Sequence, residues 1–326
     1  MSKEKIGFIG LGTMGFAMCY GLYKSGYSMV LPTYRREIDQ SCSFIPLAPN
    51  QEAKTALYDE MLNNGCEGAA NPGELFAKAD VIMISMPTSK QVEMNMYGEE
   101  GIIANAKPGT VVIDLTSADA SSTKKLYGQC LEKGIRLLDA PISGGQEGAT
   151  NQTLTVMVGG DEEIFEQVKP ILHTIGKPEK VTYVGPTGAG DALKCANNFL
   201  SCTCMLATAE ALTACAKVGI DPRVAAKVIG SGGGSSNASL YKFPHILFPD
   251  RGMKMPVDLM MKDIGLFKQL AKDNKTPSFY GDVSYNLFNI RSGEGKGGVD
   301  FSRVVTLYEE WTGVKLVGIE EPSNQN

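Results

Sequence analysis

The sequence predicts a doubly wound α/β domain followed by an all-helical domain. Over 1–186, short apolar runs that are typical of buried parallel strands alternate with helical segments. A glycine-rich segment directly follows the first of these runs. From 187 to 326 the strand-like runs cease and helical periodicity takes over. We therefore expect two domains, 1–186 and 187–326, which the length of 326 residues accommodates.

The predicted strands are nearly continuous apolar runs such as VIMIS and VVID. They lie at Ile6–Gly10, Ser28–Leu31, Val81–Ser85, Val111–Asp114, Arg136–Asp139, Thr153–Val158 and Val181–Val184. Helical spacing between them is clearest at Ser121–Lys133 and Glu162–Leu172. The region 35–67 is too long for a simple connection, so we interpret it as an insertion with an additional helix at Gln51–Asn63.

A long helix, expected to begin at Ala189 and end before Gly219, forms the predicted junction between the domains. At about 28 residues it would span roughly 42 Å. Asp221 and Pro222 then supply an N-cap and a first helical residue for the next helix. Further helices are predicted at Val257–Asp273, Ser278–Arg291 and Phe301–Trp311, and the tail after Leu316 is expected to fray.

Composition excludes several classes of function. Hydrophobic residues make up 43% of the chain and charged residues 21%, with a net charge of −5, which argues against nucleic-acid binding. No export signal and no apolar stretch near the roughly 18 residues of a membrane span are expected, so we predict a cytoplasmic protein without membrane association. The eight cysteines form no CxxC pair and only two histidines are present, so we expect reduced thiols and no metal site.

The first strand leads directly into a GxGxxG segment that opens a helix, a strong indication of a dinucleotide site in this context. Gly10 allows the tight turn, Gly12 lets the backbone approach a pyrophosphate, and Gly15 lets the helix pack close to the strand. The helix N-terminus supplies N–H groups to the phosphate. The predicted cofactor-binding residues of this loop are Gly10, Leu11, Gly12, Thr13, Met14 and Gly15.

The end of the second strand indicates which cofactor is bound. NAD sites place an acidic residue there to bind the ribose 2′-hydroxyl. Here the chain continues Thr33-Tyr34-Arg35-Arg36, and no acid occurs before Glu37. Thr33, Arg35 and Arg36 could bind a 2′-phosphate, which favours NADP over NAD. Alternatively, the two arginines are solvated charges at the start of the insertion.

The chain resembles the β-hydroxyacid dehydrogenases, which include 3-hydroxyisobutyrate dehydrogenase, tartronate semialdehyde reductase and 2-(hydroxymethyl)glutarate dehydrogenase. Among these it is most similar to the last. Four motifs carry the resemblance in order, at Gly7–Gly15, Asp139–Gly145 (DAPISGG), Gly188–Asn198 (GAGDALKCANN) and Lys262–Leu266. The likeness continues to Val314 and implies a Rossmann-like domain followed by an all-helical one.

Lys194 and Asn198 are four residues apart in the long helix, so they share a face and could hold a substrate oxygen, with Asn197 nearby. Ser143, Gly144 and Gly145 follow a strand end, where their N–H groups could hold a carboxylate. The resemblance assigns catalysis to Lys194, and substrate binding to Asn198 and to the Ser143–Gly145 segment. A surface lysine on an amphipathic helix is the alternative for Lys194.

The resemblance also implies cofactor contacts from Ser117 and Lys262, and we include Met86 and Pro87, which follow a predicted strand. Ser117 could also cap a helix, in place of the cofactor contact or together with it, and a salt bridge with Asp263 or another acid is the alternative for Lys262.

These assignments predict an oxidoreductase that transfers a hydride between NADP, or NAD, and a small 3-hydroxy acid or its semialdehyde. Lys194 would take the hydroxyl proton as the hydride leaves. Some relatives carry an arginine for a second anionic group where this chain has Ser235-Ser236-Asn237. The rest of the substrate could instead contact one of four nearby residues, among which the sequence does not choose: Asn237, Tyr241, Lys242 and His245.

Two other functions are kept as alternatives. Imine or ketimine reductases have a similar chain but generally lack the lysine of the third motif, and a non-catalytic dinucleotide-binding module would also lose it. The apolar composition of the long helix further predicts a homodimer or homotetramer, because one small domain cannot easily cover so much apolar surface.

Overall fold

The computed structural model describes residues 4–35, 48 and 50–319. The chain forms two compact units, Met1–Lys194 and Cys195–Asn326. The division falls inside helix α9 (Ala189–Lys217), the element that the sequence predicts as the junction.

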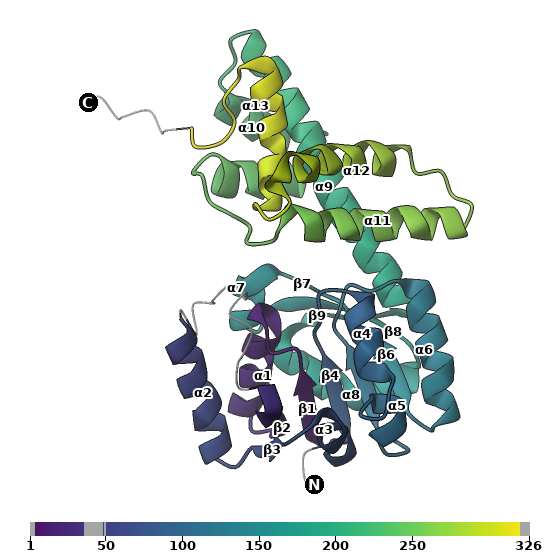
Figure 1. The fold of residues 1–326 in the computed structure, drawn as a ribbon. Helices are drawn as coiled ribbons and strands as arrows, with labels where there is room; N and C mark the ends of the chain where they lie inside the picture. The colour runs from purple at the N-terminus through teal and green to yellow at the C-terminus, as the bar shows by residue number, and fades with distance from the viewer. Residues whose placement is uncertain (1–3, 36–47, 49, 320–326) are drawn as a thin grey trace. The chain divides into compact units, whose positions relative to one another are not determined.

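The first unit is built on a sheet with nine strands in the described residues, in the order β3-β2-β1-β4-β5-β6-β8-β7, with β9 paired to β8 (Figure 1). The strands are β1 (Lys5–Ile9), β2 (Ser28–Pro32), β3 (Glu67–Ala69), β4 (Val81–Ile84), β5 (Val111–Asp114), β6 (Arg136–Asp139), β7 (Ile142–Ser143), β8 (Leu154–Gly159) and β9 (Gly176–Gly185). All seven predicted strands are present, and the predicted Rossmann-like fold class is confirmed.

The direction of the strands differs in part from the prediction. Strands β1 to β6 pair in parallel, as the buried apolar runs indicate. Strand β8 runs antiparallel to both β6 and β7, so the sheet is mixed. The reason is the connection from β7 to β8: residues 144–153, which contain only the short helix α7 (Gly145–Thr150), are too few for a parallel crossover, so the chain returns antiparallel.

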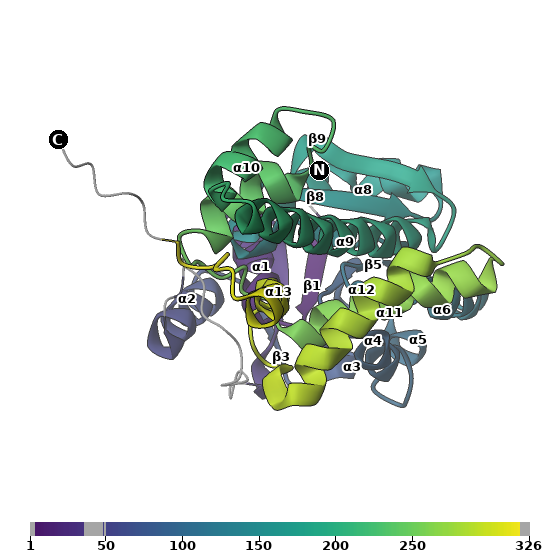
Figure 2. The ribbon, with the colours of Figure 1, turned by 90° about the horizontal axis from the view of Figure 1, so that it is seen from above.

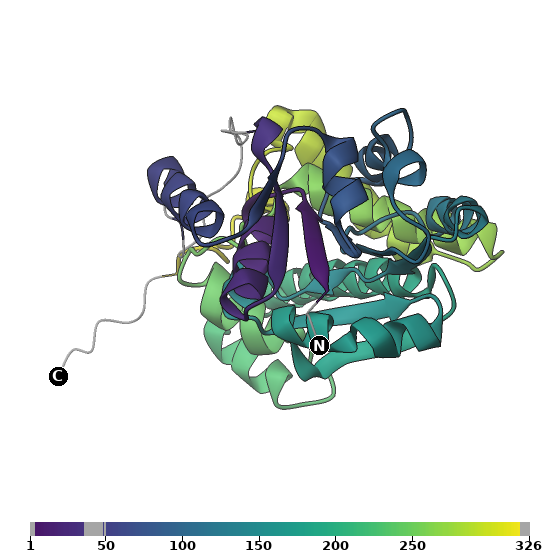
Figure 3. The same ribbon diagram turned by 90° about the horizontal axis from the view of Figure 1, so that it is seen from below.

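Helices cover both faces of this sheet (Figures 1 and 3). One face packs on α1 (Thr13–Lys24), α2 (Gln51–Asn63) and α8 (Glu162–Ile175). The other packs on α3 (Pro72–Lys78), α4 (Ser89–Met96), α5 (Ile102–Asn105) and α6 (Ala120–Glu132). Successive strand residues alternate between the two cores, as Val81 and Ile82 do, because side chains of a strand point to opposite faces.

The second unit is helical, as predicted, around one core. After α9 it contains α10 (Pro222–Gly230), the π-helix η2 (Ala238–Leu247), α11 (Val257–Asp273), α12 (Phe279–Arg291), the short turns η3 (Ser292–Lys296) and η4 (Phe301–Val305), and α13 (Thr306–Thr312). Helices α11 and α12 lie side by side (Figures 1 and 2). The segment predicted as one helix at Phe301–Trp311 is instead a 3₁₀ turn that continues into α13.

Helix α9 is long and apolar enough to cross a membrane by length and composition, with a mean hydropathy of 1.5 over 18 residues. The prediction that no stretch approaches a membrane span is wrong in this respect. Core helices of globular units pass the same test, and one side of α9 supplies Cys202, Met205, Ala209 and Leu212 to the core of the second unit. The apolar composition therefore has a structural use inside the fold.

Candidate active site

The GxGxxG loop has the backbone geometry of a dinucleotide-binding turn. Gly10 has a φ of +83°, a conformation that strongly favours glycine, and a Cβ there would collide with the carbonyl of Ser85. A Cβ at Gly15 would collide with the carbonyl of Gly10. Helix α1 begins inside the motif, at Thr13 after the N-cap Gly12, with the N–H of Phe16 bonded to the carbonyl of Gly12 at 3.0 Å. The first turn of α1 thus lies at the loop, where helix N-termini bind phosphate.

Helix α2, from the insertion, anchors this loop. The Lys54 side chain is only 5% exposed, and its ammonium donates a hydrogen bond of 2.7 Å to the carbonyl of Leu11. The same ammonium lies 5.3 Å from the centroid of the Phe16 ring. One turn further along, the Tyr58 hydroxyl donates to the carbonyl of Pro32 at 3.0 Å. Helix α2 is therefore fastened to the loop after β1 and to the end of β2.

The predicted 2′-phosphate residues are only partly described. Thr33 begins the 3₁₀ turn η1 (Thr33–Arg35), and its hydroxyl donates to the carbonyl of Ala69 in β3 at 2.7 Å. Arg35 ends this turn, and Arg36 lies outside the described residues. In the described part of this segment, the Thr33 hydroxyl thus donates its proton to a backbone carbonyl of the sheet.

The loops after β4 and β5 are joined by hydrogen bonds. The Met86 N–H donates to the Thr116 hydroxyl at 3.1 Å, and the Thr116 N–H donates to the Asp114 carboxylate at 3.0 Å. Met86, Pro87 and Ser117 all follow the carboxyl ends of parallel strands, where such sheets bind ligands. The N-cap of α6 is Asp119, whose carboxylate accepts from Ser121 at 2.7 Å, so the interpretation of Ser117 as the helix cap is wrong.

The predicted carboxylate-binding segment follows the short strand β7. Ser143 ends β7, and Gly144 and Gly145 lead into α7 (Gly145–Thr150). Both glycines have positive φ, +133° and +62°, so the backbone turns sharply there. The Oε1 atom of Gln146 is buried and has no hydrogen-bond partner within the described residues.

Lys194 is 8% exposed, so the interpretation as a surface lysine is wrong. Its turn is not buried throughout, since Leu193 is 45% exposed while Cys195 is buried. The start of its helix packs closely on the sheet, because a Cβ at Gly190 would collide with the carbonyl of Met157.

Two buried carboxyl groups hold the first turn of α9. The Asp139 carboxylate, at the end of β6, accepts from the N–H of Gly188 at 2.8 Å and from the N–H of Asp191 at 3.0 Å. Burial raises the pKa of Asp139, although these backbone hydrogen bonds oppose the rise. Burial and the neighbouring carboxylates of Asp139 and Asp114 raise the pKa of Asp191 well above its usual range. Sequence reasoning missed Asp191, which lies inside a recognised motif.

In the second unit, Asp263 connects three residues that the sequence singled out. The Asn198 amide donates to the Asp263 carboxylate at 2.6 Å, and Asn197 donates to the Asn198 oxygen at 3.2 Å. The Lys262 ammonium lies 2.9 Å from the other Asp263 oxygen. The salt bridge considered for Lys262 is thus present, and Asp263 is a buried acceptor whose role sequence reasoning missed.

The residues considered for a second substrate group lie in or next to η2. Lys242 is buried, and its ammonium donates to the carbonyl and to the hydroxyl of Ser201, each at 2.7 Å. Burial lowers its pKa. The rings of Tyr241 and His245 lie 5.3 Å apart, with Tyr241 exposed. The Lys242 ammonium is therefore hydrogen-bonded to another residue of the helical unit.

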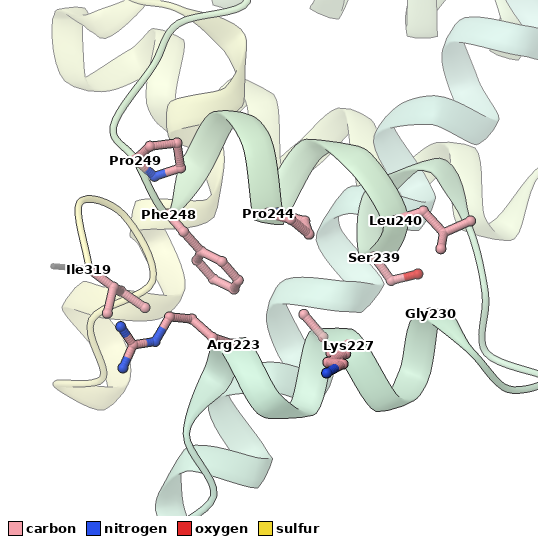
Figure 4. A pocket seen from close by; sticks show the side chains of 10 residues that line it. Arg223, Lys227, Gly230, Ser239, Leu240, Pro244, Phe248, Pro249 and Ile319 are labelled. Carbon is pink, nitrogen blue, oxygen red and sulfur yellow. The ribbon is translucent and has the colours of Figure 1, made fainter. Parts of the chain in front are cut away.

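A cavity of about 450 Å³ lies in the second unit beside α10 and η2 (Figure 4). Its lining includes the cations Arg223 and Lys227 and the apolar side chains of Leu240, Phe248 and Ile319. None of the predicted catalytic or cofactor residues lines this cavity.

The described part of the chain was predicted to hold no metal site, and its side chains form no cluster of potential metal ligands. No group of three or more His, Cys, Asp or Glu side chains there could hold a metal ion. The cysteines of the described residues are all free thiols. Burial raises the pKa of Cys130 and of Cys202 to about 12, so both are neutral near pH 7.

Comparison with known proteins agrees with this geometry. The family described as the NAD binding domain of 6-phosphogluconate dehydrogenase matches residues 47–185. The family described as NAD-binding of NADP-dependent 3-hydroxyisobutyrate dehydrogenase matches residues 188–308. The fold and the glycine-rich loop, together with these matches, define the class: an NAD(P)-dependent dehydrogenase that acts on a CH–OH group.

Relatives over the whole chain identify the family. The 2-(hydroxymethyl)glutarate dehydrogenase of Eubacterium barkeri is 36% identical over 96% of this chain and 98% of its own length. The NAD-dependent L-serine dehydrogenase of Pseudomonas aeruginosa is 30% identical over 95% and 99%. A solved 3-hydroxyisobutyrate dehydrogenase of Mycobacterium tuberculosis, with L-serine, matches with a TM-score of 0.77 at 25% identity, covering 94% of this chain and 99% of that one. The chain belongs to the 3-hydroxyisobutyrate dehydrogenase, or β-hydroxyacid dehydrogenase, family.

Proposed function

We propose that the protein interconverts a small 3-hydroxy acid and its semialdehyde, with Lys194 as general acid and base. The observation that carries this proposal is the burial of Lys194 in a turn that one buried carboxyl group fastens to strand β6 and a second fastens to the loop after β5. Lys194 is only 8% exposed and occupies the lysine position of the third family motif, and the role that we propose for it is proton transfer to and from a substrate oxygen. An imine reductase is the alternative of similar architecture, and it generally lacks this lysine.

The described residues fit a dinucleotide. The loop Gly10–Gly15 and the first turn of α1 would hold the pyrophosphate, and Ser117 would lie toward the nicotinamide. Bound NADP or NAD supplies the hydride acceptor. The carbinol C–H electron pair leaves as hydride, the O–H proton goes to Nζ of Lys194, and a C=O bond forms. In the reverse direction, Lys194 returns the proton to the carbonyl oxygen.

NADP is the proposed cofactor, with NAD as the alternative. The support is the sequence Thr33-Tyr34-Arg35-Arg36 at the end of β2, where an acid would select NAD. The L-serine dehydrogenase relative is named as NAD-dependent, which makes a direct comparison necessary. Dissociation constants measured for NADPH and NADH test the proposed preference for NADP, and tighter binding of NADH would reject it.

For the substrate, we place one carboxylate at Ser143, Gly144 and Gly145 and the reacting oxygen at Lys194 and Asn198. A second anion is not required, because Ser235-Ser236-Asn237 stands where relatives carry an arginine and because Lys242 is bonded to Ser201. Turnover of 3-hydroxyisobutyrate and L-serine, compared with that of 2-(hydroxymethyl)glutarate, tests this. Exclusive use of the dicarboxylate would reject it.

Assembly and location are further parts of the proposal. We expect a cytoplasmic homodimer or homotetramer, supported by large apolar side chains that are exposed in the second unit. These are Val224, Val228, Phe279, Tyr280, Val283 and Trp311. Light scattering at micromolar concentration should give a mass of two or four chains, and a stable monomer would contradict it.

Replacement of Lys194 tests the proposed chemistry. Lys194→Ala should lower kcat by about 10²–10⁴-fold, the range typical of general acid–base catalysis. Cofactor affinity should change little, since the glycine-rich loop lies on a different element. Lys194→Arg should not restore activity, because a guanidinium stays protonated and cannot accept the proton. An alanine variant that keeps more than about a tenth of the wild-type kcat would remove Lys194 from the mechanism.

A further inference from the structure

Asp191 occupies the first turn of α9, three residues before Lys194. It is 2% exposed, although aspartate is rarely fully buried unless its carboxyl group is paired. The proposed reaction makes no use of it. An acceptor enclosed in this way needs its hydrogen bonds to be satisfied, so its partners indicate what it holds together.

The partners of Asp191 come from a distant part of the chain. Its Oδ1 accepts from the N–H of Ala118 at 3.1 Å, and its Oδ2 accepts from the hydroxyl of Thr123 at 2.7 Å. Ala118 lies 73 residues earlier, in the loop after β5, and follows Ser117 directly. Thr123 lies in the first turns of α6. One carboxyl group thus joins the loop that contains Ser117 to the turn before Lys194.

A second carboxyl group fixes the backbone of the same turn. Asp139 at the end of β6 accepts the N–H groups of Gly188 and Asp191. The backbone of Asp191 is therefore held by β6 while its side chain holds the loop after β5. Because both contacts are buried, the position of this turn relative to the two strand ends is closely defined.

We propose that Asp191 is a positioning residue for the reaction: it holds the α9 turn that carries Lys194 against the Ser117–Ala118 segment. This rests on the proposed function of Lys194. In that function the nicotinamide side of the reaction lies at Ser117, and the proton acceptor lies at Lys194. A fixed distance between the two is what hydride and proton transfer to one substrate requires.

The charge of Asp191 is compatible with this role. Its surroundings contain the carboxyl groups of Asp139 from β6 and Asp114 from β5. Burial, and then these two groups, raise the pKa of Asp191, which favours its neutral form. A neutral carboxyl group can hold Ala118 and Thr123 without placing an anion one turn from Lys194, where an anion would stabilise the ammonium form.

Two substitutions of Asp191 test whether its hydrogen bonds position the turn: one keeps both bonds and the other removes them. Asp191→Asn keeps an oxygen for the N–H of Ala118 and offers its amide to the Thr123 hydroxyl, so kcat should stay within about threefold of wild type. Asp191→Ala removes both contacts, and kcat should fall by about 10- to 100-fold, as a displacement of about 1 Å near the chemistry does. Cofactor affinity, measured by fluorescence titration, should change less than threefold. Equal losses of kcat in both variants would overturn the proposal.

Matched variants exclude a general loss of stability. Thr123→Val removes one of the two contacts and should lower kcat by a smaller factor than Asp191→Ala. Thr208→Val removes a buried hydroxyl from the same helix, far from Asp191 in sequence, and should leave kcat unchanged. If Asp191→Ala does not fold, Thr123→Val decides: a wild-type kcat in that folded variant would overturn the proposal.

A double-mutant cycle distinguishes this proposal from the one on which it rests. In a Lys194→Ala background there is no lysine to position, so Asp191→Ala should lower kcat no further. Independent, multiplicative losses would overturn the positioning role while leaving Lys194 in the mechanism. A Lys194→Ala enzyme with near wild-type kcat would overturn the proposed function itself.

Discussion

The side-chain amide of Asn198 donates a hydrogen bond of 2.6 Å to the carboxylate of Asp263. The same carboxylate forms an ion pair of 2.9 Å with Lys262. Two residues that the sequence assigns to substrate and to cofactor therefore share one buried carboxylate. Asp263 directly follows Lys262 in the fourth family motif and orients an amide from another helix.

Substitution of Asp263 should disturb both partners at once. In Asp263→Leu, the Asn198 amide loses its acceptor and the Lys262 ammonium loses its ion-pair partner. We expect kcat/KM for the hydroxy acid to fall by about 10-fold or more, because a hydrogen bond to a charged group contributes about 1.5–3 kcal/mol. Asp263→Asn should lose less, because it keeps one oxygen. Steady-state kinetics measure the effect. The ion pair of Lys268, which is half-buried, with the exposed Asp282 offers a control from the same helix, since Lys268→Met should leave kcat/KM unchanged. A wild-type kcat/KM in the folded leucine variant would contradict the role of Asp263.

Lys54 should contribute to cofactor binding although it lies in the insertion. Lys54→Met keeps the apolar stem but removes the donor to the Leu11 carbonyl, so the glycine-rich loop loses an anchor. A hydrogen bond from a charged group contributes about 1.5–3 kcal/mol, and we expect the dissociation constant for NADPH to rise by about 10-fold. Titration of the intrinsic fluorescence measures it. Lys24→Met, at an exposed lysine of α1, is the control and should bind normally. Unchanged binding in Lys54→Met would show that the loop holds its shape without α2.

Much of the fold is predictable because its signals are local. Helix α2 matches the predicted range Gln51–Asn63, because Asn50 caps it and its apolar residues recur at helical spacing. Strand β3 has the sequence Glu-Gly-Ala, which carries no apolar pattern, and β7 has only two residues. These elements exist because neighbouring strands offer them hydrogen bonds, and a tertiary contact of this kind leaves no periodicity in the sequence.

The residues of the candidate site also fall into two groups: those that the sequence indicates and those that only tertiary contacts define. Gly10, Lys194 and Ser143 belong to contiguous motifs and are recognisable in the sequence alone. Lys54 belongs to no motif, and the roles of Asp191 and Asp263, although both lie inside motifs, are defined by the groups that they contact. Lys54 reaches a carbonyl 43 residues away, and Asp191 reaches an N–H group 73 residues away. A lysine on an amphipathic helix is usually solvated, so only the folded chain distinguishes Lys54 from its exposed neighbours.

Arg291 should stabilise the second unit without affecting the chemistry. It is 1% exposed and donates to Glu294 at 2.6 Å and to Glu310 at 2.8 Å, which joins α12 to η3 and α13. Arg291→Met removes these charge-assisted hydrogen bonds, while Glu294 and Glu310, which are 35% and 50% exposed, keep water and Lys296 as partners. We therefore expect the free energy of unfolding to fall by about 1.5–3 kcal/mol. Denaturant titration measures it. Lys296→Met, in the same cluster but exposed, should change the value by no more than about 0.5 kcal/mol. Equal effects of the two substitutions would show that burial of the guanidinium is unimportant.

The raised pKa of Asp191 predicts how stability depends on pH. Its native pKa lies above the ordinary value of 3.8, so between these two values the native state binds more protons than the unfolded state. The contribution of Asp191 to stability must therefore decrease as the pH rises from about 4 toward the native pKa. Asp191→Asn cannot titrate, so its free energy of unfolding relative to wild type should increase with pH over that window.

The effect of Asp191 has to be measured as the difference in stability between Asp191→Asn and wild type, because other carboxylates change stability with pH in the opposite direction. Hydrogen bonding and attraction from Lys78 lower the pKa of Glu74, so its contribution to stability is present at neutral pH and is lost on acidification. Glu74→Gln should accordingly lose stability relative to wild type as the pH rises from about 3 to 5. Urea denaturation of the three proteins from pH 4 to 8, with Glu74→Gln extended to pH 3, gives both differences. A difference between Asp191→Asn and wild type that stays constant with pH would show that Asp191 is already ionised in the native protein across this range.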